Sequence, residues 1–319
     1  MQLTYDSLPE DLIKFNFWNP EESIISVAPA GESNMNVVLR VNTNQRSVII
    51  KQSKPYVRKF PQIPAPINRI DVEFNFYHLI NSNKVLAGFS PKILKYCITE
   101  HTLIIQDLGD EGDFAGIYSQ SRKLTSDQLM DLVVYMDTLH KLPISNYPEN
   151  IEMRKLNHEH VFHFPFMEEN GFDLDTIQPG LQELSLEWKQ DSSLKQEIEK
   201  LGYRYLSSGD TLLHGDFYPG SWISSSGEIK VIDPEFSFKG DAEFDLGVFL
   251  AHGDFCGMTE SFENAIELNY HRAFDAKLAN QYRGVELLRR LIGIAQLPLS
   301  LTLEKKRELM EKARNFILS

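Results

Sequence analysis

Acidic side chains stand in two short stretches of the second half of the chain. Asp216 follows an apolar pair at 212–213 within the sequence Leu-Leu-His-Gly-Asp-Phe-Tyr-Pro-Gly-Ser-Trp, and Asp233 and Glu235 follow a short β-type run at 229–232. Both stretches contain glycine, proline and aspartate, which are typical of turns. We therefore expect two acid-bearing loops that face each other.

Carboxylates in this arrangement suit phosphoryl transfer to a hydroxyl group, a reaction that depends mainly on positioning and charge neutralisation. Asp216 would accept the hydroxyl proton. Asp233 and Glu235 would hold Mg2+ on the phosphates of a nucleotide, because this hard cation prefers oxygen ligands. Side chains two residues apart on an extended segment point the same way, so both carboxylates are expected to reach one ion. The alternative is a simple turn aspartate next to a buried structural histidine, and His214 is assigned such a supporting role.

The two stretches resemble the kinase-like phosphotransferases that include the aminoglycoside, choline and methylthioribose kinases. Three features are most similar to methylthioribose kinases: serine rather than asparagine at Ser221, Asp-Pro-Glu-Phe rather than a plain Asp-x-Glu, and Phe-Lys-Gly leading into Phe244-Asp245. Two motifs in this order, about 15 to 20 residues apart, are far more specific than a lone His-Gly-Asp. The resemblance implies ATP and Mg2+ as cofactors and Asp216 as the catalytic base.

Alternating apolar residues predict strands at 24–28, 36–41 and 48–52. The loop between the first two is small and polar, and backbone N–H groups of such a loop can bind phosphates. Gly31, Ser33 and Asn34 are its candidates. A plain hairpin turn remains the alternative, because the loop lacks the second glycine of a Gly-x-Gly-x-x-Gly motif.

Lys51 ends the third predicted strand, where an inward lysine needs an anionic partner. The kinase-like fold places there the lysine that pairs with the α- and β-phosphates. The Pro-Tyr-Val-Arg stretch at 55–58 again resembles methylthioribose kinases. A helix is expected at 68–80, with Glu73 pairing with Lys51 and Asp71 in reserve, although a glutamate on a wet helix face is the alternative.

Two further strands are predicted at 93–96 and 103–105, followed by Gln-Asp-Leu-Gly-Asp. This segment resembles the family's hinge, where backbone groups bind the adenine edge, and Gln106 and Leu108 are the candidates. Downstream, helical periodicity replaces alternation. The resemblance therefore implies an α+β, protein kinase-like two-lobed fold. The expected parts are an N-terminal nucleotide-binding lobe (1–105, an antiparallel sheet with one main helix), a hinge (106–110) and a mainly helical catalytic and substrate-binding lobe (111–319).

Helices are predicted at 125–141 and 181–205 of the second lobe. Between them, Asn-His-Glu-His-Val-Phe-His at 157–163 raises the question of zinc, since alternate histidines on a strand share a face. The segment has neither a nearby cysteine nor the H-E-x-x-H spacing, so a polar loop with a structural or substrate-side role is the better interpretation.

A helical segment at 286–296 resembles the twin-arginine segment that contacts the sugar in methylthioribose kinases. Arg289 and Arg290 are therefore expected to bind substrate. Adjacent positions diverge by about 100° on a helix, so both reach one ligand only at a bend or groove edge. A solvated helix end is the alternative. The expected nucleotide-site residues are Gly31, Ser33, Asn34, Lys51, Glu73, Gln106, Leu108 and Ser221.

The net charge of −13 argues against nucleic acid and anionic membranes as partners. Cys97 and Cys256 have no metal-ligand spacing, which favours a reducing cytoplasmic setting. No secretory signal and no membrane span are expected. The predicted partner is a small-molecule hydroxyl substrate, and a homodimer is kept open.

The resemblance implies an ATP-dependent kinase that phosphorylates a hydroxyl of a methylthioribose-like sugar. An aminoglycoside, choline or other small-alcohol phosphotransferase of the same fold is the first alternative, since Pro219-Gly220 resembles those kinases. Arg289 and Arg290 favour hydroxyls or an anionic group over a cationic aminoglycoside. A nucleotide-binding protein without transfer activity is the second alternative, although Asp216 is present.

Overall fold

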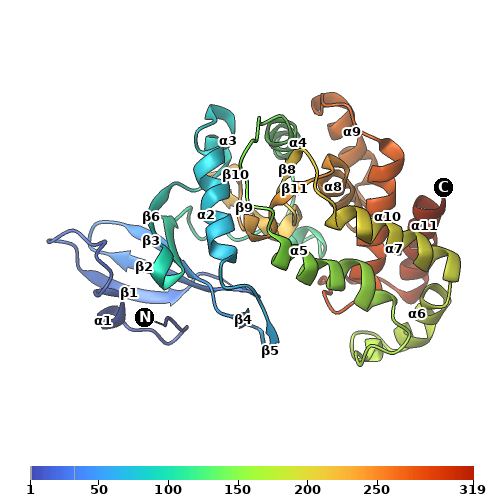
Figure 1. The fold of residues 1–319 in the computed structure, drawn as a ribbon, viewed down its shortest axis with the longest axis horizontal. Helices are drawn as coiled ribbons and strands as arrows, with labels where there is room; N and C mark the ends of the chain where they lie inside the picture. The colour runs from blue at the N-terminus through green and yellow to red at the C-terminus, as the bar shows by residue number, and fades with distance from the viewer. Residues whose placement is uncertain (1, 32) are drawn as a thin grey trace. The chain divides into compact units, whose positions relative to one another are not determined.

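The computed structural model describes residues 2–31 and 33–319, which form two compact units (Figure 1). The first unit comprises Met1–Gly112 and Ile223–Ser237, and the second comprises Asp113–Trp222 and Phe238–Ser319. The acid-bearing segment with Asp233 thus belongs to the first unit. The hinge at 106–110 stays a prediction.

A five-stranded antiparallel sheet in the order β1-β2-β3-β7-β6 forms the centre of the first unit. Its strands are β1 (Ile24–Pro29), β2 (Val37–Thr43), β3 (Ser47–Gln52), β6 (Ile93–Cys97) and β7 (Thr102–Gln106). Alternate residues of β2, beginning with Val37, are buried, which is the period expected of a sheet with one face on a core. That core includes Leu3, Leu12 and Phe15 from the start of the chain.

The remaining elements of the first unit lie around this sheet. They are α1 (Pro9–Leu12), the hairpin of β4 (Tyr56–Val57) and β5 (Phe60–Pro64), α2 (Arg69–Ile80), α3 (Lys84–Phe89), the turn η1 (Ile98–Glu100), the hairpin of β9 (Trp222–Ser225) and β10 (Glu228–Val231), and the 3-10 turn η7 (Pro234–Phe236). Helix α1 has only four residues. After it, the Leu12 carbonyl accepts from the Phe15 N–H at 3.0 Å and from the indole N–H of Trp18 at 2.7 Å.

The second unit is mainly helical. Its elements are η2 (Ala115–Ile117), α4 (Ser126–His140), α5 (Ile151–His158), η3 (Glu159–His163), η4 (Phe164–Phe166), η5 (Leu174–Thr176), α6 (Leu181–Lys189), α7 (Ser192–Leu206), β8 (Thr211–Leu213), η6 (Pro219–Ser221), β11 (Phe238–Gly240), α8 (Ala242–Phe255), α9 (Thr259–Asn269), α10 (Ala276–Ile292) and α11 (Leu303–Leu318). Helix α10 packs against both α8 and α11. Strands β8 and β11 pair antiparallel, so they bring together the segments that precede Asp216 and follow Glu235.

Two segments of the second unit differ from the sequence-based expectation. The helix expected at 181–205 is two helices, because Asp191 caps the start of α7 by accepting a hydrogen bond from the Leu194 N–H at 3.0 Å. The segment at 157–163 is helical rather than loop or strand, and Glu159–His163 forms a π-helical turn. Glu159 lies 2.8 Å from His163, a contact that the helical spacing of four residues allows.

The antiparallel sheet of the first unit and the helices of the second confirm the predicted α+β, protein kinase-like fold class. No helix within residues 2–31 and 33–319 is long and apolar enough to cross a membrane.

Gly247 marks a close approach of α8 to α10. A Cβ atom there would lie 2.7 Å from the Ala279 carbonyl oxygen and 2.7 Å from the Arg283 nitrogen, so the helices would have to move apart. We expect Gly247→Ala to lower the free energy of unfolding by about 1–3 kcal/mol, as overpacking does. Gly88→Ala is the control, since a Cβ there meets nothing within 4 Å. Urea titrations that show equal stability for both variants would contradict this packing.

Candidate functional site

Lys51 is the centre of a buried charge cluster in the first unit. It lies on β3, opposite Val38 of β2 and Leu103 of β7. Its ammonium is 2.6 Å from a carboxylate oxygen of Glu73 on α2 and also donates to Asp233, which precedes η7. The side chain of Lys51 is 4% exposed and that of Glu73 is fully buried, while that of Asp233 is 47% exposed. A buried cation is tolerated because it is paired in this way.

The electrostatic environment keeps Lys51 charged. Burial works to lower its pKa, but the carboxylates of Asp233 and Glu73 outweigh burial and raise it. Burial raises the pKa of Glu73 to about 7 against the opposing influence of Lys51. The cluster therefore presents a fixed positive charge next to a partly exposed carboxylate.

Glu235 lies deeper than Asp233 and has its own partners. The Asn36 amide donates to its carboxylate at 2.9 Å, and Arg69 lies 3.2 Å away. Burial raises the pKa of Glu235, although the Arg69 guanidinium opposes that shift. Arg69 is fully buried and also donates to backbone carbonyls, including that of Met35 at 2.7 Å. The contacts of Asn36 and Arg69 with Glu235 were not expected from the sequence, in which these residues are simply polar positions at the start of a strand and of a helix.

The segment that carries Asp233 and Glu235 is not extended. The expectation that their side chains point the same way because they lie two residues apart on a strand is therefore wrong. Asp233 has φ = 64°, and a 3-10 turn follows from Pro234. Aspartate tolerates the left-handed region, and the fixed φ of proline suits the first position of a helical turn. The Asp233 N–H donates to the Tyr77 hydroxyl at 3.2 Å. This bond ties the turn to α2.

These two carboxylates do not form a complete metal site by themselves. Within the described residues, no group of three or more His, Cys, Asp or Glu side chains is arranged to hold a metal ion. Mg2+ is commonly bound by one or two carboxylates together with substrate phosphates and water. Asp233 and Glu235 therefore fit a metal that arrives with a nucleotide.

The loop after β1 is anchored by the β4–β5 hairpin. Arg58 donates through Nε to the Ser33 carbonyl at 2.7 Å, and the Lys59 N–H donates to the Asn34 carbonyl at 3.0 Å. Gly31 has φ = 114°, a conformation that favours glycine. Glu32, within the same loop, lies outside the described residues. The Pro-Tyr-Val-Arg stretch thus has a structural task, since it fixes the candidate phosphate loop.

The segment that follows β7 is fixed by a residue to which the sequence gave no role. Asp107 accepts from the Arg40 guanidinium at 2.8 and 3.1 Å and from the Gly109 N–H at 2.9 Å. Burial works to raise the pKa of Asp107, but these hydrogen bonds and one from Ser47 lower it overall. Gln106 is held by its N–H, which donates to the Lys92 carbonyl at 2.9 Å. Gln106 and Leu108 are the residues predicted to contact adenine. The backbone between them is therefore fixed by these hydrogen bonds.

In the second unit, the loop that carries Asp216 is built around Asp245. This buried carboxylate accepts from the N–H groups of His214 at 2.7 Å and Gly215 at 3.0 Å. Gly215 has φ = 82°, and the Ser221 hydroxyl donates to the Asp216 carbonyl at 2.8 Å. His214 is fully buried. Ser221 thus contacts the loop that carries Asp216. Its role in nucleotide binding stays a prediction.

The twin arginines are buried and face Asp216. Nη2 of Arg289 is 3.9 Å and Nη2 of Arg290 is 3.6 Å from one Asp216 carboxylate oxygen. Both guanidinium groups also bind Glu286, one turn earlier on α10. They are only 6% and 7% exposed, so the alternative of a solvated helix end is wrong.

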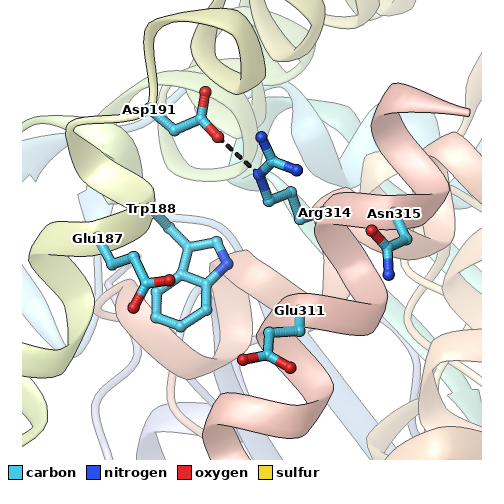
Figure 2. Close-up of a pocket in the computed structure, with 6 residues that line it drawn as sticks. All are labelled: Glu187, Trp188, Asp191, Glu311, Arg314 and Asn315. Carbon is cyan, nitrogen blue, oxygen red and sulfur yellow. Dashed lines mark hydrogen bonds and ion pairs between the residues drawn. The ribbon is translucent and has the colours of Figure 1, made fainter.

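Two cavities in the second unit contain none of the predicted site residues. One, of about 460 Å³, is lined by Glu187, Trp188, Asp191, Glu311, Arg314 and Asn315 (Figure 2). Arg314 points across it to Asp191 at 2.7 Å, as Figure 2 shows. The other, of about 900 Å³, is a groove beside the π-helical turn. Neither changes the assignment of candidate residues.

The fold is of the protein kinase-like class. Residues 25–283 match the phosphotransferase enzyme family, and the chain belongs to that family. Its relatives include methylthioribose kinases from Exiguobacterium sibiricum, 29% identical over 243 residues, and Bacillus cereus, 27% identical over 234 residues. These matches cover 72% and 70% of this chain but 60% and 58% of the relatives, so the chain spans less than two thirds of their length. The predicted family resemblance is confirmed.

Solved structures share the fold at low sequence identity. The choline kinase from Streptococcus pneumoniae superimposes with a TM-score of 0.53 at 16% identity, covering 97% of this chain and 98% of that one. A spectinomycin phosphotransferase in complex with ADP and spectinomycin gives 0.50 at 14% identity, covering 93% and 92%. At these identities the likeness establishes the fold alone.

The Lys51 cluster predicts a coupling between two buried charges. Lys51→Met leaves Glu73 buried without its cation and should lower the free energy of unfolding by about 3–5 kcal/mol. Adding Glu73→Gln should recover part of that loss, because the amide needs no cation, whereas Glu73 must either stay charged without one or take up a proton. Lys92→Met, at an exposed position, is the control and should change little. Urea unfolding of the four proteins without nucleotide measures this, and strictly additive losses would contradict the pairing.

Proposed function

We propose that this protein is an ATP- and Mg2+-dependent small-molecule kinase that phosphorylates a hydroxyl group of a methylthioribose-like sugar. The observation that carries the proposal is the placement of the Asp216 carboxylate beside two buried guanidinium groups. A carboxylate can take the acceptor proton, and guanidinium groups donate hydrogen bonds to hydroxyl oxygens. The methylthioribose kinase relatives support the same acceptor.

The first unit would bind the nucleotide. Lys51, kept charged by Glu73, would donate to the α- and β-phosphates, as the corresponding lysine does in kinases. Asp233 and Glu235 would hold Mg2+, which supplies positive charge to the transferring phosphoryl group. We assign the loop and hinge positions to the phosphates and the adenine edge. They are Gly31, Ser33, Asn34, Gln106 and Leu108, and Ser221 completes the proposed nucleotide set.

The charge balance around Asp216 favours a neutral acceptor. The guanidinium groups of Arg289 and Arg290 are matched by the carboxylates of Glu286 and Asp216. A cationic acceptor such as choline or an aminoglycoside would gain no net attraction from a site whose charges already balance, and its own charge would have to be buried without a free partner. A polyol needs only hydrogen bonds from these groups. The sugar is therefore preferred over the amino alcohols.

Acceptor-dependent ADP release tests the proposal. Methylthioribose, ribose, choline, ethanolamine and spectinomycin would each be supplied with ATP and Mg2+, and the phosphorylated product would be identified by mass spectrometry. We expect methylthioribose to give the highest kcat/KM and the cationic acceptors to give little turnover. Preferred turnover of a cationic acceptor would replace the sugar assignment, and ATP binding without turnover on an extended acceptor panel would favour a nucleotide-binding protein.

Loss of either proposed metal ligand should weaken nucleotide binding in the presence of Mg2+. Asp233→Ala and Glu235→Ala each remove a negative oxygen from a doubly charged ion, and we expect at least about tenfold weaker binding, since even an outer partner of a metal ligand has this effect. Calorimetric titration of each variant with and without Mg2+ measures it. Glu21→Ala, at an exposed acid of the same unit, is the control. Unchanged affinity in Mg2+ for both variants would show that the metal assignment is wrong.

Asp216→Asn should reduce turnover without affecting nucleotide affinity. The amide keeps the size of the side chain but cannot accept the acceptor proton, and positioned proton transfer contributes about 10²- to 10⁴-fold. Steady-state kinetics with methylthioribose, alongside nucleotide titration, separates the two effects. Asp210→Asn, which changes a 91% exposed carboxylate of the same unit, should retain full turnover. An Asp216→Asn variant as fast as the native protein would exclude Asp216 as the base.

A further inference from the structure

Glu286 lies at the centre of a buried network on the inner face of α10. Its side chain is 1% exposed, and Arg289 and Arg290 stand three and four residues later, which puts all three on one side of the helix. One carboxylate oxygen binds Nε of Arg289 and the other accepts from Nε of Arg290 at 2.8 Å. The two guanidinium charges stabilise the ionised form of Glu286 and lower its pKa, although burial works in the opposite direction.

This contact determines the orientation of both guanidinium groups. A guanidinium is planar and rigid, so fixing its Nε atom also directs its terminal nitrogens. With Nε on Glu286, the Nη2 atoms of Arg289 and Arg290 lie within 3.9 Å of Asp216. Arg290 has further anchors in the Tyr218 ring, 4.8 Å from its guanidinium carbon, and in the Ala295 carbonyl at 3.3 Å. Arg289 depends more heavily on Glu286.

The network continues behind Glu286 into α8. Nε2 of His252 lies 3.2 Å from Glu286, and Nδ1 of His252 is 2.6 Å from the Tyr118 hydroxyl. Burial lowers the pKa of His252 to about 4, so the imidazole is neutral near pH 7. A neutral imidazole that carries its proton on Nε2 accepts from the Tyr118 hydroxyl at Nδ1, while Nε2 contacts the Glu286 carboxylate without the alignment of a hydrogen bond. His252 therefore packs against Glu286 without adding positive charge.

We propose that Glu286 is a positioning residue for the acceptor site: it holds both guanidinium groups toward Asp216, and the Tyr118–His252 pair packs behind its carboxylate. The inference rests on the proposed function, because the acceptor is the molecule that the oriented groups bind. Without Glu286, two unbalanced guanidinium groups would turn onto Asp216 and compete with the acceptor hydroxyl for the base. Glu286 therefore leaves the two guanidinium groups free to bind the acceptor and the Asp216 carboxylate free to accept its proton.

Glu286→Gln tests the proposal. The amide oxygen can accept from one arginine, but the amide NH2 faces the Nε–H of the other, so at least one guanidinium loses its anchor. We expect the KM for methylthioribose to rise about 10- to 100-fold, as for loss of an outer partner at a binding site, while the KM for ATP stays unchanged. Tyr118→Phe, a milder change that removes one hydroxyl, should raise the KM for methylthioribose less and in the same direction.

Asp254→Asn is the matched control, since it also alters a buried carboxylate bound to an arginine of α10. Arg283 donates to Asp254 at 2.7 Å through each of two nitrogens and also pairs with Glu263, so this cluster is built like that of Glu286 but on another part of α10. A purely structural role for Glu286 predicts similar losses of melting temperature and the same acceptor KM for the two variants. That result would overturn the proposal. If Glu286→Gln does not fold, the KM for methylthioribose is measured for Tyr118→Phe instead. A KM equal to that of the native protein would also overturn the proposal.

The proposed function and this inference fail in different ways. If the native protein turns over no acceptor, the proposed function fails before any variant is compared. The positioning of the arginines is then measured by NMR, through hydrogen exchange of their Nε–H groups. We expect slow exchange for Arg289 and Arg290 in the native protein and fast exchange for at least one of them in Glu286→Gln. Equal exchange in both proteins would overturn the positioning role.

Discussion

The buried ammonium group of Lys51 is the interaction on which the first unit depends. A charge in the interior is costly unless it is paired and hydrogen-bonded, and Lys51 meets that condition only because α2 brings Glu73 to it and the turn before η7 brings Asp233. Segments far apart in the sequence are therefore held at one point. Asp233 remains half exposed. Of the two carboxylates that bind Lys51, it is the one that solvent or a ligand can reach.

A similar balance of charge organises the surroundings of Asp216 in the second unit. Asp245 fixes the backbone of the loop that presents Asp216, and Glu286 fixes the two arginines opposite. The Asp216 loop and the two arginines are thus each held by a buried carboxylate. Such preorganisation matters for phosphoryl transfer, because positioning and electrostatics supply most of the rate enhancement.

Sequence reasoning predicted elements whose signal is local and missed contacts that arise from the fold. The helix that carries Glu73 follows from its apolar residues, and the α+β class follows from the change of period along the chain. Asp245, Arg69 and Glu286 carry no such signal. The sequence does not distinguish a solvent-exposed charged residue of a helix from a buried one. Trp18 shows a further limit: its indole donates to the Leu12 carbonyl at the end of α1, a contact that periodicity does not encode. Motif resemblance proposed the reacting groups, which stay a prediction, while the residues that contact them could be found only from the tertiary structure.

The most direct test of this account is a crystal structure with Mg2+ and a non-hydrolysable ATP analogue. We predict that Lys51 keeps its contact with Glu73 and donates to the α- and β-phosphates, while Asp233 leaves Lys51 to bind the metal ion together with Glu235. A nucleotide bound elsewhere, with the Lys51–Asp233 pair unchanged, would contradict the account.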